Sequence, residues 1–283
     1  MPGSLYLVAT PIGNLGDVSK RAAQTLSEVD FIAAEDTRVT LKLLLHLKIK
    51  KQLISYREHN SRESGEQILK RLQTGENCAL VTDAGTPGVS DPGEDLVRLC
   101  LESGIPVIAI PGPCAAITAL LLSGLPSGRF TFEGFLSTTK KSRFEHLNDL
   151  KTEKRTMIFY EAPHKLKRTL NDMLSIFGDR HISISRELTK LYEETLRCTL
   201  SEAIAHYEQK PPRGEFVLIL EGADNNSPVD IDLTQAIAIV NSYVSEGISL
   251  KDAVKKAAEE TNAPKNALYN AAIKQGAGRN AYS

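Results

Sequence analysis

The stretch ALVTDAGTPGVSDPGEDL, residues 79–96, places an apolar run directly before a loop that holds Gly85, Gly88 and Gly93. A glycine-rich turn between a strand and a helix lets backbone N–H groups face a ligand, and the N-terminus of the helix adds partial positive charge. The loop does not match the phosphate-binding template GxxxxGKS/T, because no lysine follows Gly93, and DAGTPG does not match GxGxxG. The stretch therefore predicts a strand, a ligand-binding turn and a helix, and argues against nucleoside triphosphates and dinucleotides.

The same order of strand and helix recurs through the first part of the chain. Short apolar runs at 5–10, 31–36, 53–56, 79–83 and 106–110 alternate with amphipathic helical stretches. This alternation predicts a parallel sheet with helices on both faces. Glycine and proline cluster after the first, fourth and fifth runs. Because the carboxyl ends of parallel strands share one edge, these three loops are expected to form a single ligand cleft.

The later part of the chain is richer in strand-like runs and predicts a second α/β domain with a mixed sheet. A polar stretch without periodicity follows it, and then three short helical stretches typical of a helix-turn-helix-like module. The predicted divisions are an N-terminal α/β domain at 1–118, a second α/β domain at 119–222, a linker at 223–231 and a helical module at 232–276. The two α/β domains are expected to join around Gly124 to Gly128.

Composition narrows the class of protein. Hydrophobic residues make up 41% of the 283 residues and charged residues 24%, as in soluble globular proteins. The formal net charge of -1 argues against a chain coated with basic residues, although one domain could still carry a basic face. No apolar run is long enough to span a membrane and no signal pattern is present, so a cytoplasmic location is expected. The 4 cysteines lie singly among apolar neighbours, which predicts buried thiols and no metal site.

Eight longer motifs follow one another between about Ser4 and Gly222. They are LYLVATPIGNLGD (5–17), AAEDTR (33–38), ALVTDAGTPGVSDPG (79–93), IPGPCAAITAL (110–120), FEGFL (132–136), FYEAPHK (159–165), SRELTK with YEE (185–194) and GEFVLILEG (214–222). In this order they closely resemble the ribosomal RNA small subunit methyltransferase I family. That family belongs to the tetrapyrrole methylase superfamily, the class III S-adenosylmethionine-dependent methyltransferases.

The resemblance implies a fold, an activity and partners. It implies two α/β domains with S-adenosylmethionine in a deep cleft between them, and a homodimer. It also implies 2'-O-methylation of a cytidine ribose in the decoding centre of 16S rRNA, in the free rRNA or in the 30S subunit. The C-terminal helices are similar to the family's helix-turn-helix appendage.

Cofactor contacts carry over from the superfamily where motifs align. The resemblance implies that the cofactor is bound by Pro11, Ala84, Gly85, Thr86, Val89, Cys114, Ala115, Glu161 and Leu188. Related tetrapyrrole enzymes have a Gly-Asp pair where this chain has Gly85 and Thr86, so the role of Thr86 departs from the family pattern. A cysteine near a helix N-terminus can act as a nucleophile, but the resemblance assigns Cys114 to the wall of the cofactor pocket.

Methyl transfer to a ribose hydroxyl requires alignment of the 2'-oxygen and removal of its proton. Charged or polar residues that follow predicted strands offer candidates: Glu35, Asp36, Arg38, Glu58, His59, Asn60, Arg186, Glu187 and Lys190. Among them His59 and Lys190 are the predicted proton acceptors, and Arg38 is predicted to position phosphate. The alternative is that these charges pair with one another and brace the cleft.

Two other functions stay open at this point. A small-molecule methyltransferase that acts on a tetrapyrrole is compatible with the fold, although AAEDTR and the C-terminal helices favour RNA. A non-enzymatic RNA-binding or ribosome-assembly protein would explain the helical module but not three ligand loops on one sheet edge. Basic clusters at 48–51, 138–143, 165–168 and 255–265 could follow an RNA backbone or lie on solvated helix faces.

Overall fold

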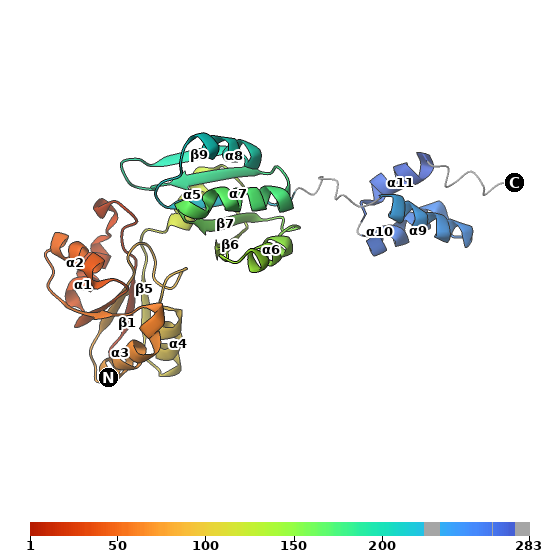
Figure 1. The fold of residues 1–283 in the computed structure, drawn as a ribbon. Coiled ribbons are helices and arrows are strands. Elements are labelled where there is room, and N and C mark those ends of the chain that lie inside the picture. Colours follow the sequence, from red (N-terminus) through yellow and green to blue (C-terminus); the bar gives the residue numbers. More distant parts are fainter. Residues whose placement is uncertain (224–232, 262, 275–283) are drawn as a thin grey trace. The chain divides into compact units, whose positions relative to one another are not determined.

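The computed structural model describes residues 1–223, 233–261 and 263–274 (Figure 1). The chain divides into two compact units, Met1–Ala223 and Asp224–Ser283. The first unit contains two lobes, each built on its own sheet. No helix in the described residues is long and apolar enough to cross a membrane.

The first lobe is built on a parallel sheet of five strands with the order β3-β2-β4-β1-β5. The strands are β1 (Leu5–Val8), β2 (Phe31–Ala34), β3 (Gln52–Ser55), β4 (Cys78–Val81) and β5 (Val107–Ile110). The predicted parallel arrangement is confirmed. Since β4, β1 and β5 are neighbours in the sheet, the three glycine- and proline-rich loops that follow them leave the same edge side by side.

Helices cover both faces of this sheet. They are α1 (Lys20–Glu28), α2 (Thr37–His46), α3 (Ser61–Gln73) and α4 (Glu94–Glu102), with the short 3-10 helices η1 (Leu15–Asp17) and η2 (Glu58–Asn60). Side chains alternate along β2, so that Phe31 packs toward α3 and α4 while Ile32 packs toward α1 and α2. Figure 1 shows the two helix pairs on opposite sides of the strands. Burial on both faces explains why these strands are continuous apolar runs.

The second lobe is built on a mixed sheet of five strands with the order β6-β7-β10-β8-β9. The strands are β6 (Phe130–Phe135), β7 (Thr156–Glu161), β8 (His181–Arg186), β9 (Glu194–Thr199) and β10 (Phe216–Leu220). Only β6 and β7 pair in parallel within the described sheet, and the other pairs are antiparallel. The predicted mixed sheet is therefore confirmed. A bulge between Phe132 and Gly134 shifts the register of β6.

Helix α5 belongs with the second lobe. The helices of this lobe are α5 (Ala115–Ser123), α6 (Lys140–Asp149), α7 (Pro163–Phe177) and α8 (Leu200–Gln209). Ala119 and Leu120 of α5 pack against β7 and β10, while α6, α7 and α8 contribute to the core on the other face of the sheet. The chain therefore passes between the lobes before α5, and not around Gly124 to Gly128. The predicted boundary at residue 118 lies inside α5, so Ala115 and Ala116, which were placed in the first domain, pack with the second sheet.

The second unit contains three helices in its described residues. They are α9 (Leu233–Ser245), α10 (Leu250–Thr261) and α11 (Lys265–Lys274), which pack around a core of small apolar side chains that includes Ala253 and Ala257. Gly247 ends the turn after α9 with a φ of +86°, a conformation that favours glycine. The predicted linker at 223–231 lies outside the described residues apart from Ala223, and so do both ends of the predicted module at 232–276.

Candidate functional site

A cavity of about 340 Å³ lies between the two lobes of the first unit. Its volume falls in the range of roughly 300–1,000 Å³ that is common for small-molecule sites. The first lobe contributes the loops after β1 and β4, and the chain before and into α5 adds Cys114 and Ala115. The second lobe contributes the ends of β6 and β7, the loop after β8 and the start of β10. The cavity therefore lies at the sheet edge that the sequence predicts for a ligand.

Hydrogen bonds hold the first-lobe loops together at the cavity. The backbone of Thr10 donates to the carbonyl oxygen of Gly85 at 2.8 Å, and the Gly85 N–H donates back at 3.1 Å. The Thr86 hydroxyl donates to the carbonyl oxygen of Pro113 at 3.2 Å, which links the loop after β4 to the loop after β5. Gly85 has a φ of +87° and so takes a conformation that favours glycine. The three loops thus form one connected wall.

Backbone strain is concentrated beside the cavity. Four non-glycine residues in the described chain have a positive φ, and three of them, Ser90, Glu187 and Thr189, lie in the loops after β4 and β8. Such conformations cost of order 1–3 kcal/mol each and persist only where the surroundings impose them. Ser90 contacts the second lobe, since a Cβ placed on Gly134 of β6 would lie 3.2 Å from the Ser90 hydroxyl oxygen. Ser90 and Glu187 line the cavity and Thr189 adjoins it, so the strained backbone lies at the candidate site.

The second-lobe wall carries Glu161 and Lys190, both with fixed partners. The Glu161 carboxylate is almost fully buried and accepts from the Ala162 N–H at 2.8 Å and from the Thr169 hydroxyl at 2.5 Å. The Lys190 ammonium donates to Glu187 at 3.1 Å and to Glu215 at 3.4 Å. Burial alone would lower the pKa of Lys190, but the hydrogen bond to Glu187 and the two carboxylate charges raise it overall. Lys190 is thus a fixed cation at neutral pH.

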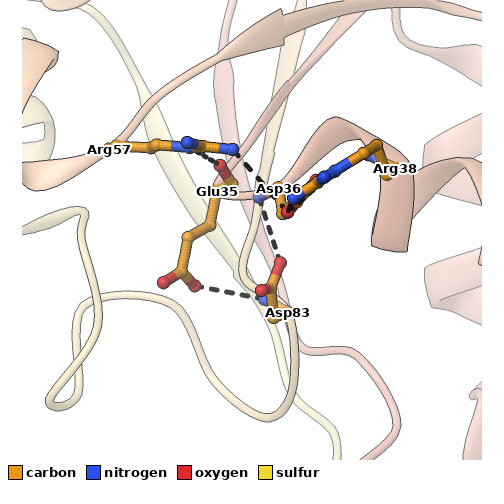
Figure 2. Close-up of polar contacts among 5 residues, drawn as sticks. All are labelled: Glu35, Asp36, Arg38, Arg57 and Asp83. Atoms are coloured by element: carbon orange, nitrogen blue, oxygen red, sulfur yellow. Dashed lines mark hydrogen bonds and ion pairs between the residues drawn. The ribbon is translucent and has the colours of Figure 1, made fainter.

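A charged network braces the loops after β2 and β4 (Figure 2). The Arg57 side chain donates to the carbonyl oxygen of Glu35 at 2.8 Å and lies 3.7 Å from the Asp36 carboxylate. The Asp36 N–H donates to Asp83 at 3.0 Å, and the Asp83 N–H donates to Glu35 at 3.3 Å. Arg38 donates to Asp36 and holds the pKa of that carboxyl well below its usual range. These contacts position Glu35 and Asp83 at the cavity wall.

The cavity lining is strongly acidic. Six carboxylates line it, against the single ammonium of Lys190 among the described lining residues: Glu35, Asp83, Asp91, Glu161, Glu187 and Glu215. Burial raises the pKa of Glu35 and of Asp83. Burial, with the neighbouring charges of Glu35 and Asp83, raises the pKa of Asp91 to about 7. Such a lining favours a ligand or a ligand group that is positively charged.

Eight of the nine predicted cofactor residues line this one cavity. They are Ala84, Gly85, Thr86, Val89, Cys114, Ala115, Glu161 and Leu188. Pro11 is not part of the lining, and its neighbour Ile12 takes that place and packs against Leu188 and Val217 of the second lobe. The structure thus brings together predicted residues from both lobes, and the most distant pair among these eight, Ala84 and Leu188, is 104 positions apart in the sequence. Their contact with a cofactor stays a prediction.

The three predicted catalytic residues are not brought together. Lys190 lines the cavity, whereas His59 in η2 and Arg38 in α2 do not. The Arg38 side chain is 81% exposed and pairs with Asp36, as the bracing alternative expects. Asp91 and Tyr160 also line the cavity, although the sequence analysis did not predict either of them as a site residue. Asp91 lies within the quoted glycine loop, but nothing in its spacing distinguishes it from a turn residue.

In the basic cluster at 138–143, the side chain of the arginine is buried in the protein interior. The Arg143 side chain is 3% exposed and donates to Asp172 at 2.7 Å and to the carbonyl oxygens of Ser137 and Thr138 at 3.0 and 3.1 Å. Arg143 therefore supports the packing of α6 against α7 and is not available to an RNA backbone. Lys140 and Lys141 of the same cluster are exposed.

Two family models match the chain. Residues 4–204 match the model described as Tetrapyrrole (Corrin/Porphyrin) Methylases, which spans most of the two lobes. Residues 235–276 match the model described as the RsmI C-terminal HTH domain, which coincides with α9, α10 and α11.

Curated relatives match over nearly the whole chain. The ribosomal RNA small subunit methyltransferase I of Halalkalibacterium halodurans is 50% identical over 271 residues, which cover 95% of this chain and 94% of the relative. The protein of the same name from Thermotoga maritima is 48% identical over 222 residues, which cover 78% of this chain and 100% of the relative. A solved uroporphyrin-III C-methyl transferase from Thermus thermophilus, complexed with S-adenyl homocysteine, has a TM-score of 0.56 and 20% identity, covering 77% of this chain and 97% of that chain. The last similarity concerns the fold alone.

Proposed function

The chain belongs to the ribosomal RNA small subunit methyltransferase I family, and we propose that it transfers a methyl group from S-adenosylmethionine to the ribose 2'-oxygen of a cytidine in 16S rRNA. The main support for this proposal is the similarity to relatives of that name. One of them is 50% identical to this chain in an alignment that covers 95% of it. We further propose that the protein acts in the cytoplasm, where ribosomal subunits are assembled, and that it works as a homodimer.

The cavity has the chemistry that S-adenosylmethionine requires. When bound, this cofactor supplies a methyl group on a positively charged sulfonium. The acidic lining offsets that charge, and the side chains of Ile12, Val89 and Leu188 offer an apolar surface for an adenine ring. The glycine loop after β4 lets the backbone approach the ligand closely. We therefore assign the cofactor to this cavity, with the eight predicted residues that line it as its contacts.

The enzyme's own residues would do little covalent chemistry. Because the sulfonium is a good leaving group, the protein has to align the 2'-oxygen with the methyl carbon and remove the hydroxyl proton. The Thr10–Gly85 and Thr86–Pro113 hydrogen bonds connect the loops after β1, β4 and β5. We propose that these connected loops keep the methyl carbon aligned with the 2'-oxygen. The ion pairs of Lys190 with Glu187 and Glu215 hold the loop after β8 on the opposite wall.

The C-terminal helices are proposed to help bind the ribosomal substrate. Their match to the RsmI C-terminal HTH model supports this role, and Lys251 and Lys255 on α10 are exposed. The Thermotoga maritima relative is covered completely by 222 residues, about the length of the first unit. Methyl transfer is therefore assigned to the first unit and substrate affinity in part to the second. A tetrapyrrole acceptor is disfavoured, since the relatives that match at high identity carry a ribosomal RNA name.

The test is transfer of a labelled methyl group from S-adenosylmethionine to 16S rRNA, free and within 30S subunits, followed by nuclease digestion to identify the modified nucleoside. A 2'-O-methylated cytidine is the expected product. Label on a porphyrin-type acceptor with none on RNA would support the tetrapyrrole alternative. RNA binding without any binding of S-adenosylmethionine would support a non-enzymatic assembly protein.

A matched pair of variants ties the activity to the cavity. Ala115→Leu adds a larger side chain to the cavity wall at the start of α5, and it is expected to weaken S-adenosylmethionine binding at least about 10-fold. Ala205→Leu makes the same change on an exposed position of α8 and is expected to bind the cofactor as the native protein does. Equal binding by both variants, measured by isothermal titration calorimetry, would remove this cavity as the cofactor site.

A further inference from the structure

The second lobe contains another cavity, of about 490 Å³, beside the one assigned to the cofactor. It lies where the loop 187–193, which joins β8 to β9, meets the segment 210–214, which joins α8 to β10. Four of its lining side chains are cationic or aromatic, and together they are called the basic groove: Arg186, Tyr192, Lys210 and Arg213.

The charge of this groove is opposite to that of the cofactor cavity. Its described lining residues carry three cations and a single carboxylate, that of Glu187. Glu187 also lines the cofactor cavity, and there it accepts a hydrogen bond from the Lys190 ammonium at 3.1 Å, so its charge is already offset. The protein therefore places an acidic cavity, suited to a sulfonium, next to a basic groove, suited to phosphate.

The cations of the groove are only partly paired. Arg186 donates to the Glu194 carboxylate at 2.6 Å, and the Lys210 ammonium lies 3.3 Å from both oxygens of the same carboxylate. Arg213 is exposed, and no hydrogen bond or ion pair to its guanidinium is found in the described part of the chain. Three cations thus share one carboxylate partner, and the groove keeps an excess of positive charge that attracts a polyanion.

Tyr192 adds an exposed aromatic ring to these cations. The loop that carries it is braced by its own backbone, because Lys190 donates to the carbonyl oxygen of Glu187 at 3.0 Å and Glu193 to that of Lys190 at 3.1 Å. The Thr189 N–H donates to the Glu193 carboxylate at 2.6 Å. Tyr192 is nevertheless 71% exposed. An exposed ring beside cations is the combination that binds single-stranded nucleic acid, in which a base stacks on the ring and the cations follow the phosphates.

The groove continues directly into the wall of the cofactor cavity. Gly214 has a φ of +86°, and a Cβ added to it would overlap the Glu187 carboxylate, so the two segments are in close contact. The next residue, Glu215, lines the cofactor cavity and lies 3.4 Å from the Lys190 ammonium. A strand whose target ribose lies at the cofactor cavity can therefore place its neighbouring nucleotides in the groove.

From this arrangement we propose that the basic groove binds the single-stranded segment of 16S rRNA that adjoins the target cytidine. Arg213 and Lys210 contact backbone phosphate, and Tyr192 stacks on a neighbouring base. The proposal rests on the proposed function and names the surface of the first unit that holds its substrate. Because this contact lies outside the cofactor cavity, it contributes to RNA affinity and not to S-adenosylmethionine affinity.

The first test separates stacking from apolar contact at position 192. Tyr192→Leu keeps an apolar side chain but removes the ring, and it should weaken the affinity for 30S subunits and for a short single-stranded RNA about 10-fold, as loss of one stacked base does. Tyr192→Phe keeps the ring and should bind both within about twofold of the native affinity. Both variants should melt within about 2 °C of the native protein, because the side chain is exposed.

The second test compares Arg213→Ala with Arg168→Ala, which removes an exposed arginine on α7 outside the groove. Arg213→Ala should reduce the magnitude of the slope of the logarithm of RNA affinity against the logarithm of salt concentration by about 0.7, because one phosphate contact is lost. Arg213→Lys should keep the native slope, since it keeps the charge. Arg168→Ala should keep the slope as well, and calorimetry should give all these variants the native affinity for S-adenosylmethionine.

Three results would overturn the proposal. Tyr192→Leu and Arg213→Ala could both bind 30S subunits and single-stranded RNA as the native protein does, or Arg168→Ala could change the slope as much as Arg213→Ala. A weakened affinity for 30S subunits with unchanged binding of single-stranded RNA would indicate contact with a ribosomal protein instead. Since these assays measure binding alone, a native protein that binds RNA through the groove but methylates no RNA would contradict the proposed function and not the groove.

Discussion

Replacing Arg143 with methionine is expected to destabilise the first unit by about 3 kcal/mol. Breaking a buried ion pair by removal of one partner costs about 3–5 kcal/mol, because the other charge is left unpaired. Asp172 is 14% exposed and can regain some hydration, which places the loss near the lower limit. The carbonyl oxygens of Ser137 and Thr138 also lose their donor, while the methionine side chain keeps much of the apolar packing.

The loss is large enough to measure by thermal unfolding. For a unit of 223 residues, each kcal/mol shifts the melting temperature by about 2–4 °C, so Arg143→Met should melt about 6–12 °C below the native protein. Adding Asp172→Leu to the same chain removes the stranded charge and should recover about half of the loss. Lys141→Met serves as the control, because Lys141 is 88% exposed and its substitution should change stability by less than about 0.5 kcal/mol.

The same variants separate a structural role from RNA binding. If Arg143 braces α6 against α7, the variant should bind 30S subunits normally at temperatures where it remains folded. An unchanged melting temperature together with a weakened affinity for 30S subunits would refute the reasoning, since Arg143 would then act on the RNA backbone.

Two further predictions concern the glycine loop and the C-terminal helices. Gly93→Ala, which places a Cβ 3.0 Å from Leu80 at a φ of +149°, should displace the loop after β4 and weaken S-adenosylmethionine binding about 10-fold in a calorimetric titration. Gly104→Ala, with a φ of +69° and no atom within 4 Å of the added Cβ, should cost about 1 kcal/mol of stability and leave binding unchanged; equal effects on binding would contradict the argument. The double variant of Lys251→Glu and Lys255→Glu should raise KM for 30S subunits and leave the S-adenosylmethionine affinity unchanged. The slope of the logarithm of its affinity for 30S subunits against the logarithm of salt concentration should fall in magnitude by about 1.5, because two phosphate contacts are lost. An unchanged slope would exclude contact of these lysines with phosphate.

The shared edge of the first-lobe loops could be predicted from local sequence patterns, whereas the second-lobe residues of the candidate site could not. The loops after β1, β4 and β5 could be placed on one edge because apolar periodicity defines strands, and parallel strands point their carboxyl ends the same way. Glu161 and Leu188 were predicted as cofactor contacts only from the family resemblance. The local sequence pattern does not show which residues of the second lobe face the first lobe. Pro11 and Ile12 differ by one position, and the direction of each side chain at the end of a strand depends on the packing of the second lobe.

Charge patterns gave the least reliable predictions. A cluster of basic residues in sequence does not reveal that one member, Arg143, turns inward to meet Asp172 on another helix. His59 was chosen by residue type and loop position, but η2 does not bring it to the cavity. Lys190 does line the cavity, yet its two carboxylate partners come from positions 187 and 215 and make it a fixed cation. The tertiary structure decides which charged side chains form ion pairs with one another.

The sequence by itself determined the layered α/β architecture, the mixed character of the second sheet, the helical C-terminal module and the edge of the first sheet at which the cavity lies. These follow from periodicity and turn residues, which act over a few neighbouring positions. The tertiary structure decided which side chains face the cavity from the second lobe and which arginine is buried. Those outcomes depend on contacts between residues far apart in the chain, and burial and proximity then set the charge state that the chemistry uses.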